Sequence, residues 1–492
     1  MSATGPQAAE SGTFERELAA GLPADCCLTS REAKRPYECD GLSAYHEVPR
    51  VVVLPQTREQ VEHVVNVCRT HGVPLVTRGA GTGLSGGALP LANGCLMSLA
   101  AFNRVIDIDT DNLTATVEPG VRNLAISEAV APHGLYYAPD PSSQIACSIG
   151  GNVAENSGGV HCLKYGLTVH NVLEVKIITI DGQWLTLGGR SLDTPGLDLL
   201  AIMHGSEGLL GVIMEVTVKL LPRPERAQVM LAPFAAVADA GNAVAEIIAA
   251  GIVPGGLEMM DKLAVEVVEA FCGAGYPLDA EAVLLCEVDG NDADVEAQVR
   301  AVGEILTRCG AGEIRISQNE SERLELWAGR KAAFPAIGRI APDLYCIDGT
   351  IPRRHLVQVL QAISDLSEEY GLPVANVFHA GDGNLHPLIA FDANDDDELK
   401  RTESLGSRIL SLCVEVGGTV TGEHGVGVEK LNEMCVQFTP AELRQMHTIK
   451  AAFDPESLLN PGKGVPTLNR CAEFGAMHIR QGHDPHPNLE RF

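Results

Sequence analysis

Three glycine-dense segments in the first half of the chain restrict its fold more than any other feature. The first is TRGAGTGLSGGA at residues 77–88, and the others are PDPSSQIACSIGGNVAENSGG at 139–159 and HGSEGLLGV at 204–212. Because glycine has no Cβ atom, successive backbone N–H groups in such a segment can approach a phosphate closely and form an anion-binding nest. We therefore expect the first segment to bind a phosphate, and the three together to enclose a long ligand.

The first segment contains the pattern G-x-G-x-x-G at Gly81, Gly83 and Gly86. In a dinucleotide-binding βαβ unit this pattern follows a strand and directly precedes a helix. VPLVT is suitable as the strand, but the following ALPLANGCLMSL contains Pro90 and Gly94 and lacks a helical period. The pattern is thus a poor match to a nicotinamide site. A tight connection without a ligand is the alternative to the phosphate nest.

The order of the expected elements gives an α+β fold with two regions. The first contains a short strand near residue 51, an amphipathic helix that ends at Gly72, and strand candidates at 171–182 and 211–222. From residue 228 to about 317, short strands and helices alternate, which favours a separate antiparallel sheet with helices on one face.

The predicted domain division has four segments: an N-terminal segment 1–49, a first domain 50–226, a second domain 227–454, and a C-terminal segment 455–492 that returns to the first domain. Within the second domain, a helix is expected over residues 353–370. Thr439 and Glu442 form a capping box, which predicts another helix start.

Composition limits the partners and the compartment. The net charge of −28 argues against nucleic acids and anionic membranes, which select basic surfaces. The chain has no run of 18 apolar residues and no secretory signal, so we expect a soluble cytoplasmic protein that reaches an inner membrane only through partners.

Its 14 cysteines include no C-x-x-C pattern, which predicts mostly reduced thiols and no iron–sulfur ligand set. The acidic run DANDDDE at 392–398 is expected to be a solvated loop.

Two histidines flank a Gly-Asp-Gly-Asn sequence in NVFHAGDGNLHPLIAF, residues 376–391. Asp-Gly favours a two-residue type I′ turn, and such a turn at Asp382-Gly383 would pair His379 directly with His386. Cross-strand Cβ atoms then lie about 4.5–5.5 Å apart, close enough for the two imidazoles to chelate a metal ion. The alternative is an ordinary hairpin with one buried and one exposed histidine.

Several long motifs together resemble a known family. RGAGTGLSGG, APDPSS, GGNVAENSGG and GSEGLLGV are similar to the FAD-binding domain of the vanillyl-alcohol-oxidase-type flavoproteins. HAGDGNLHP, TGEHGVG and LLNPGK narrow the resemblance to the FAD-linked D-2-hydroxyacid dehydrogenase branch. PYECDGLSAY, PGGLEMMD and RCAEFGAMH resemble the bacterial glycolate oxidase D subunits within it. The resemblance extends from about Tyr37 to the C-terminus. It implies a two-part FAD-binding domain and a mixed α/β substrate domain with an antiparallel sheet.

The resemblance also implies a noncovalent FAD, because Thr82 stands where some relatives attach the cofactor through a histidine. The residues implied to hold FAD lie in the glycine-rich segments and in LNPGK, and they are Gly79, Gly81, Thr82, Gly83, Gly86, Gly87, Asp140, Ser143, Gly151, Asn152, Ser157, Gly158, Gly159, Glu207, Gly208 and Asn460.

For the chemistry, the resemblance assigns His379, His386 and Glu423 to a divalent metal site. Two neutral imidazoles and a carboxylate with open positions suit zinc or another borderline ion. A metal there would acidify the α-hydroxyl of the substrate. His424 is implied as the base that takes the hydroxyl proton, while the Cα hydride passes to flavin N5. The product is a 2-oxoacid.

Arg330 matches the substrate-binding arginine of the branch, since a guanidinium can bind a carboxylate through two hydrogen bonds. Arg339 is a second candidate. Phe334 and Leu388 stand where relatives that oxidise a five-carbon diacid have polar residues. They would shorten the pocket and leave a second carboxylate unpaired. The expected substrate is therefore glycolate or D-lactate rather than 2-hydroxyglutarate.

The resemblance further implies that electrons pass to partners, a second flavin-type subunit and an iron–sulfur subunit of a glycolate oxidase complex. The tail CAEFGAMHIRQGHDPHPNLERF, residues 471–492, is the expected docking segment, and simple packing against the first domain is its alternative role. Three other functions stay open at this point: a D-2-hydroxyacid dehydrogenase that acts alone, a metal-dependent hydrolase, and a flavin-binding subunit without chemistry of its own.

Overall fold

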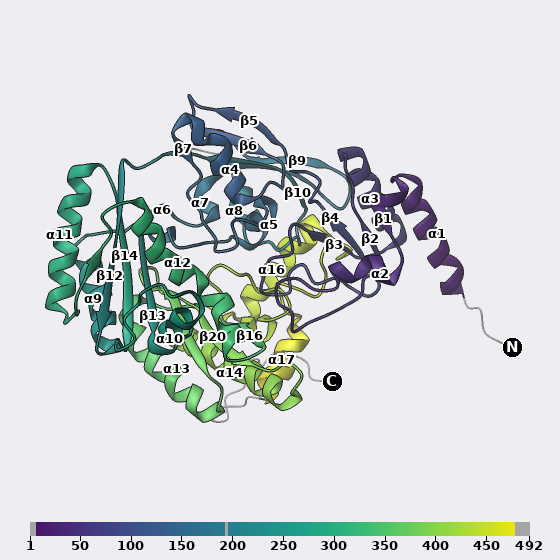
Figure 1. Cartoon of the computed structure of the whole chain (residues 1–492). Coiled ribbons are helices and arrows are strands. Elements are labelled where there is room, and N and C mark those ends of the chain that lie inside the picture. The colour runs from purple at the N-terminus through teal and green to yellow at the C-terminus, as the bar shows by residue number, and fades with distance from the viewer. Residues whose placement is uncertain (1–5, 192–194, 478–492) are drawn as a thin grey trace.

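The computed structural model describes residues 6–191 and 195–477. Within these residues the chain forms two regions, each built on its own sheets (Figure 1). The first region contains a four-stranded and a five-stranded sheet, and the second contains a nine-stranded sheet covered by helices. The predicted α+β fold is confirmed.

The four-stranded sheet of the first region has the order β1 (Cys27–Leu28), β2 (Val51–Val53), β4 (Cys95–Ser98), β3 (Leu75–Arg78). Strands β2, β4 and β3 are parallel, and α3 (Arg58–His71) connects β2 with β3. Thr57 caps this helix through its side chain, and Gly72 ends it with a φ of 60°. The chain then runs from β3 to β4 through the glycine-rich loop with no helix between them, as the sequence predicts.

The five-stranded sheet is antiparallel and has the order β5 (Val105–Asp109), β6 (Thr114–Val117), β10 (Val212–Lys219), β8 (Val172–Ile178), β9 (Trp184–Gly188). The second and third glycine-rich segments lie in connections beside this sheet. The remaining elements of the first region are α1 (Pro6–Ala20), α2 (Arg31–Lys34), α4 (Asn123–Val130), β7 (Leu135–Tyr136), α5 (Ile149–Glu155), α6 (Cys162–Tyr165), α7 (Thr168–Asn171), α8 (Leu199–Met203) and β11 (Leu221–Pro222).

The nine-stranded sheet has the order β15 (Arg315–Ile316), β12 (Arg226–Phe234), β14 (Ala282–Gly290), β13 (Gly256–Asp261), β18 (Val374–His379), β19 (Asn384–Leu385), β17 (Gly349–Thr350), with β20 (Pro387–Phe391) and β16 (Asp343–Cys346) branching from β18. Its helices are α9 (Val237–Ala249), α10 (Lys262–Cys272), α11 (Asp292–Arg308), α12 (Glu320–Ala336), α13 (Leu356–Tyr370) and α14 (Asp396–Glu415). The chain then forms α15 (Leu431–Gln437), α16 (Pro440–Phe453) and α17 (Leu468–Met477). The capping box of Thr439 and Glu442 opens α16 as predicted.

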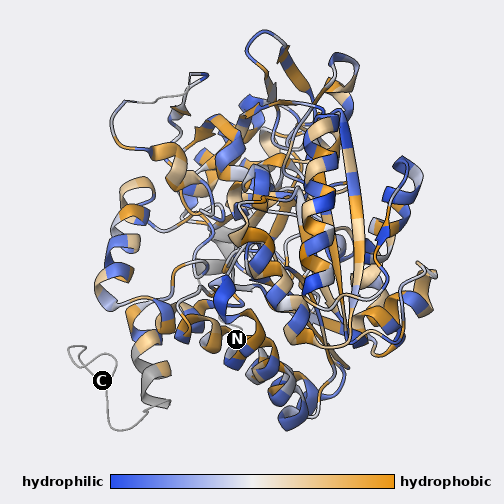
Figure 2. Cartoon of the chain, turned by 90° about the vertical axis from the view of Figure 1, so that its left-hand side faces the viewer, coloured by the Kyte–Doolittle hydropathy of each residue, from blue (hydrophilic) through white to orange (hydrophobic). Residues whose placement is uncertain are grey.

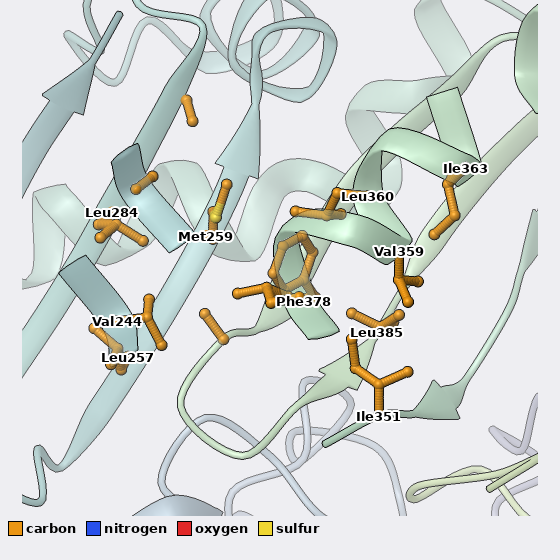
Figure 3. Packing of buried hydrophobic residues seen from close by; sticks show 14 of the residues in the cluster. Val244, Leu257, Met259, Leu284, Ile351, Val359, Leu360, Ile363, Phe378 and Leu385 are labelled. Atoms are coloured by element: carbon orange, nitrogen blue, oxygen red, sulfur yellow. The ribbon is translucent and has the colours of Figure 1, made fainter. Parts of the chain in front are cut away.

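The two faces of the nine-stranded sheet pack against different helices. Helices α9, α11 and α13 cover one face, where Phe378 packs near Leu360 of α13 and Leu257 packs near Val244 of α9 (Figure 3). Burial of a side chain such as Phe378 contributes about 1.5–3 kcal/mol. Helices α10 and α12 cover the other face. Glu258 follows Leu257 in the chain, and His379 follows Phe378. Because side chains alternate along a strand, Glu258 and His379 point to the opposite face, which α12 covers.

The register of the histidine hairpin differs from the predicted one by two residues. His379 pairs with Asn384, and Asn376 pairs with Pro387, so the turn contains four residues instead of two. Gly383 has a φ of 85°, whereas Asp382 does not take the positive φ that a type I′ turn requires. A shift of two preserves the face of every side chain, because the side-chain period of a strand is two. The prediction of a direct pair between His379 and His386 is therefore wrong, but both side chains still share one face.

Of two smaller predictions, the structure corrects one and confirms the other. The acidic run 392–398 is not a loop throughout, because Asp395 caps α14 and the following acidic residues form the first turn of this helix. Negative charges are stabilised there by the helix dipole. The prediction of mostly reduced cysteines is confirmed, with one pair as the exception: Cys435 and Cys471 form a disulfide between α15 and α17. The other cysteines of the described segments are free thiols.

The end of the chain returns to the first region. Leu459 forms a parallel bridge with Leu75 of β3, and Asn460 N–H donates to the carbonyl oxygen of Leu75 at 2.9 Å. In Figure 1 this yellow segment lies beside β3 and β4. Helix α17 packs against α15 and α16 through a small cluster around the disulfide. Residues 478–492, most of the expected docking tail, lie outside the described residues.

Hydrophobic and hydrophilic residues are interleaved along the helices of both regions (Figure 2). Among the residues that the structure describes, no helix combines the length and the apolar character needed to cross a membrane.

Candidate functional site

A cavity of about 440 Å³ lies between the glycine-rich loops of the first region and the α12 face of the second. Most residues predicted to hold the cofactor line it, namely Gly79, Gly81, Thr82, Gly83, Gly87, Ser143, Gly151, Asn152, Ser157, Glu207 and Gly208. The second region contributes Arg330, Lys331, Phe334, Pro335, Val377, His386, Leu388, Glu423 and His424. The cavity therefore joins the predicted cofactor loops to the predicted catalytic residues.

The other predicted cofactor residues, Gly86, Asp140, Gly158, Gly159 and Asn460, do not line the cavity but shape the loops around it. At Gly158 an added Cβ atom would lie 2.4 Å from Glu423 Oε2, so a side chain there would displace the carboxylate. Asn460 Nδ2 donates to the carbonyl oxygens of Gly87 and Glu207 at 2.9 and 2.7 Å, which ties two cofactor loops to the C-terminal segment.

The cavity wall has the properties that a phosphate-bearing cofactor needs. At Gly79 an added Cβ atom would lie 2.2 Å from Ser148 Oγ, so only glycine permits this close approach of the two loops. Thr77 and Ser148 line the cavity with buried hydroxyl groups that have no hydrogen-bond partner in the described part of the chain. Because buried polar groups are normally satisfied, these hydroxyls are available to a bound ligand. The residues fit FAD.

His379, His386 and Glu423 converge at the end of the hairpin. The Nε2 atoms of His379 and His386 lie 3.3 and 3.2 Å from Glu423 Oε1, and the two ring centroids are 5.0 Å apart. All three ligand atoms lie within 4.8 Å of one another, a donor set that suits zinc or a similar divalent ion. The ligand atoms of Asp348, His386 and His424 also lie within 4.8 Å of one another and form a second compact group.

The charges of His379, His386 and Glu423 compensate one another. Burial lowers the pKa of His379, but the charge of Glu258 raises it well above its usual value. Burial also lowers the pKa of His386, and the nearby carboxylates of Asp348 and Glu423 outweigh this effect and raise it. Burial raises the pKa of Glu423, whereas the adjacent imidazoles of His379 and His386 hold it well below the usual range. The group therefore holds positive charge around an anionic carboxylate, either as protons or as a divalent cation.

Glu258 connects the hairpin with Arg330. It lies directly opposite His379 in the β13–β18 register, and its Oε1 accepts a hydrogen bond from His379 Nδ1 at 2.7 Å. Its Oε2 accepts from Arg330 Nε and Nη2 at 2.9 and 2.8 Å. A carboxylate in this position orients a metal-binding imidazole. The Glu258 side chain is fully buried, so both partners are required to compensate its charge.

The loop 421–427 carries Glu423 and His424 and is held from both regions. On the second region, Asp348 accepts several of its backbone N–H groups. On the first region, Glu207 accepts the N–H groups of the loop residues 426 and 427 at 2.7 and 2.6 Å. Glu207, which the sequence predicts as a cofactor residue, thus also links the glycine-rich loops to the loop that carries His424.

His424 lies beside the metal-site residues with its ring stacked on that of His386, at a centroid distance of 4.9 Å and an interplanar angle of 5°. Burial lowers the pKa of His424 to about 4, although the charge of Asp348 opposes this effect. The imidazole is therefore neutral at neutral pH and can accept a proton. Its Nδ1 is buried and has no hydrogen-bond partner among the described residues.

The predicted substrate residues separate into two groups. Arg330, Phe334 and Leu388 line the cavity, and Leu388 is fully buried there. Arg339 lies outside the cavity on an exposed turn after α12, so the structure does not bring it to the site. Lys331 lines the cavity but has no counterpart among the residues predicted from the sequence.

Sequence reasoning missed three carboxyl groups at the site: Glu258, Asp348 and Glu155. Glu155 lines the cavity, and burial together with the charge of Glu207 raises its pKa well above the usual value. Each is a single acidic residue in an apolar or glycine-rich segment. A single residue forms no motif whose spacing could identify it. The available signal for Glu258 was a charge inside the apolar strand GGLEMM, where burial requires a partner.

Two known domain families match the chain. Residues 49–188 match the family described as "FAD binding domain", and residues 223–464 match "FAD linked oxidases, C-terminal domain". The structure of 4-ethylphenol oxidase from Gulosibacter chungangensis has the same fold, with a TM-score of 0.79 at 16% identity over 95% of this chain and 99% of that chain.

Several relatives are similar over nearly their whole length. The chain is 64% identical to glycolate oxidase subunit GlcD of Escherichia coli K12, covering 93% of this chain and 92% of the relative. It is 38% identical to the subunit of the same name from Bacillus subtilis, with coverages of 88% and 93%. Identity to a D-lactate dehydrogenase of Archaeoglobus fulgidus is 33%, with coverages of 85% and 92%. The chain therefore belongs to the FAD-linked oxidases of the vanillyl-alcohol-oxidase type and is an FAD-binding oxidoreductase.

Proposed function

We propose that this enzyme oxidises a small 2-hydroxyacid, glycolate or D-lactate, to the corresponding 2-oxoacid. The names of the relatives, glycolate oxidase subunits and a D-lactate dehydrogenase, support this substrate class. The observation that carries the proposal is that Arg330, Glu423 and His424 line the same cavity as the glycine-rich loops. Because the chain is an FAD-binding oxidoreductase, the metal-dependent hydrolase is no longer a candidate function.

Arg330 binds the substrate carboxylate. One edge of its guanidinium is bound to Glu258, which fixes the side chain so that the rest of the group faces the cavity. Phe334 and Leu388 limit the space beside it and offer no partner for a second carboxylate. This arrangement supports a substrate of two or three carbons.

His424 removes the proton of the α-hydroxyl group, which its place in the cavity wall and an Nδ1 atom without a partner among the described residues support. A divalent ion held by His379, His386 and Glu423 would act as a Lewis acid that makes this hydroxyl more acidic. FAD, when bound, supplies the acceptor for the Cα hydride. Loss of one proton to His424 and of one hydride to bound FAD would balance the oxidation and leave the 2-oxoacid.

The cofactor is bound without a covalent link, and its electrons go to a second flavin-type subunit and an iron–sulfur subunit. Thr82, which lines the cavity, has a hydroxyl rather than an imidazole to offer to the flavin. The relatives named as subunits support a multi-subunit enzyme.

Anaerobic bleaching of the flavin tests the substrate and the metal together. Glycolate and D-lactate should bleach the visible spectrum of the purified chain, and D-2-hydroxyglutarate should not. His379→Ala and His386→Ala should lower metal content and the bleaching rate together. His447→Gln is a control: His447 lies on α16, where its Nε2 contacts the carbonyl oxygen of Pro466 at 3.0 Å, and this variant should bleach normally. Full bleaching by a metal-free preparation would contradict the metal role.

A further inference from the structure

Asp348 is a fully buried carboxylate between β16 and β17, and the loop 421–427 folds around it. Its Oδ1 accepts the N–H groups of Gly422 and Glu423 at 3.0 and 3.1 Å, and its Oδ2 accepts that of His424 at 2.9 Å. Three consecutive amides of the loop therefore point at one carboxylate, and two of them belong to the proposed metal ligand and the proposed base.

Two side chains complete this anchor. Thr421 Oγ1 donates to Asp348 Oδ2 at 2.6 Å, and Lys430 Nζ donates to the same oxygen at 3.1 Å. Lys430 also donates to the carbonyl oxygen of Gly425 at 3.0 Å and is fully buried. The lysine thus compensates the charge of Asp348 and holds the far end of the loop.

The loop has no helix or strand between residues 421 and 426 to fix its shape. The direction of the Glu423 and His424 side chains therefore depends on the contacts of their own backbone. Glu423 Oε1 lies 3.2 Å from His386 Nε2, and a backbone rotation about Asp348 would break this approach and the stacking of His424 on His386.

Asp348 could instead be a metal ligand itself, because it forms the second compact group with His386 and His424. The distances argue against this role. His386 Nε2 lies 3.7 Å from Asp348 Oδ1 but 3.2 Å from Glu423 Oε1. Both oxygens of Asp348 already accept backbone N–H groups, whereas Glu423 Oε1 faces the imidazoles. Asp348 acts through the backbone.

We propose that Asp348 is a positioning residue whose carboxylate orients Glu423 toward the hairpin histidines and His424 toward the cavity. This inference rests on the proposed metal site and base. Loss of the carboxylate should weaken metal binding and slow flavin reduction, while FAD binding and the substrate clamp at Arg330 stay intact.

Three variants of the full chain with bound FAD separate positioning from general stability. Asp348→Asn removes the anchor, and Asp348→Asn/Lys430→Met removes both charges of the buried pair. Asp454→Asn is the matched control, since Asp454 is also fully buried, accepts the N–H of Leu458 at 3.1 Å and forms an ion pair with Lys450, but lies away from the metal site. Each protein is assayed for Zn²⁺ affinity against a chelating dye, anaerobic flavin reduction, FAD absorbance and Tm.

Both Asp348 variants should bind Zn²⁺ about 10–100-fold more weakly than the wild type, the usual effect of losing an orienting partner. The limiting rate of flavin reduction should fall, while the substrate concentration for half-maximal rate changes by less than about threefold. The Asp454→Asn control should lower Tm and keep wild-type Zn²⁺ affinity. At saturating Co²⁺, the electron paramagnetic resonance spectrum of Asp348→Asn should match that of the wild type.

Wild-type Zn²⁺ affinity in both Asp348 variants would overturn the inference. Recovery in the double variant alone would also overturn it, because the defect would then come from the uncompensated charge of Lys430. A changed Co²⁺ spectrum would make Asp348 a ligand rather than a positioning residue. A wild-type chain that binds no Zn²⁺ overturns the metal site and this inference together, so failure of the proposed function is distinguishable from failure of the inference alone.

Discussion

Glu258 shows how one residue can serve two functions at the site. Its two oxygens bind different partners, the imidazole of His379 and the guanidinium of Arg330, so the proposed metal ligand and the substrate clamp share one carboxylate. Burial raises the pKa of Glu258, but the charges of His379 and Arg330 lower it below the usual value. The carboxylate is therefore ionised, and its partners are fixed by charge as well as by geometry.

Replacement of Glu258 by Gln should destabilise the protein by about 3–5 kcal/mol, because it leaves the buried Arg330 without a counter-charge. Urea denaturation of the two proteins measures this difference. Glu118→Gln is a matched control: its carboxylate is also buried, but its partner Arg104 is 79% exposed, so the expected loss is about 0–1 kcal/mol. Equal losses in the two variants would contradict the role of Glu258.

At the residue scale, the sequence predicted the groups that carry a spacing and missed those that act through burial. His379, His386, Glu423 and His424 lie in glycine-flanked motifs, and the structure brings all four together. Asp348 has no such signal. Its importance depends on which backbone amides and side chains surround it. These groups lie 74 to 82 residues away in the sequence, so no local pattern predicts the contacts.

His161 links elements of the two regions. Its Nδ1 lies 2.8 Å from Asp140 Oδ2 in the second glycine-rich segment, and its Nε2 lies 3.0 Å from Glu287 Oε1 on β14. Glu287 Oε2 also accepts hydrogen bonds from Arg323 and Trp327 of α12, the helix that carries Arg330. One imidazole thereby sets the distance between a cofactor loop and the helix of the substrate clamp.

The stability that this bridge contributes should depend on pH. Burial lowers the pKa of His161, but the charge of Asp140 raises it well above 6.5, so the contribution is complete below pH 6.5 and is lost as pH rises through the raised value. Burial raises the pKa of Glu287, whereas its bond to His161 lowers it to about 2, so that contribution is complete above pH 4.5. The Tm difference between wild type and His161→Gln should therefore be largest at about pH 5–6 and shrink in more alkaline buffer.

Trp327→Phe is the comparison, because it removes an uncharged donor to Glu287 at 2.5 Å. Its Tm deficit should not shrink above pH 6.5. If the two variants follow the same pH profile, the charge of His161 does not stabilise the bridge.

At the element scale, the periodicity of the sequence predicted helices and strands correctly, whereas the turn preference predicted the wrong strand register for the hairpin. The alternating strands and helices after residue 226 and the capped helices α3 and α16 follow from local pattern. The hairpin turn does not, because pairing of β19 with β17 adds a second neighbour that competes with the turn preference of Asp-Gly. The acidic run at 392–398 was assigned by charge alone, although the same residues stabilise a helix start.

For the whole molecule, we expect all of the FAD to be released by acid. Thr82 offers no imidazole for a covalent link to the flavin, and the loops that line the cavity present backbone groups and hydroxyls to a ligand. After acid precipitation the yellow colour should be in the supernatant. Flavin fluorescence that migrates with the chain on a denaturing gel would contradict this expectation.

If the proposed partner subunits exist, the isolated enzyme should reduce quinone much more slowly than a complex reconstituted with them. The cysteines of the described residues form no cluster-type ligand group, and the compact metal-type groups found there contain histidine and carboxylate. Steady-state quinone reduction by both preparations measures the difference. An artificial dye should be reduced equally by both, which controls for the catalytic half-reaction. Equal quinone rates would show that no partner is needed.

The return of the C-terminal segment to the first region determines when the cofactor site can form during synthesis. Asn460 contacts the Gly87 loop across a separation of 373 residues, and Lys463 donates to the same carbonyl oxygen at 3.0 Å. At about 5–20 residues per second, the ribosome needs roughly 20–75 s to bridge that interval. The glycine-rich loops are therefore made early but receive this support only after residues 460 and 463 have been translated. Loading of FAD is thus a late step, and a chain interrupted before Asn460 lacks the contacts that close the site.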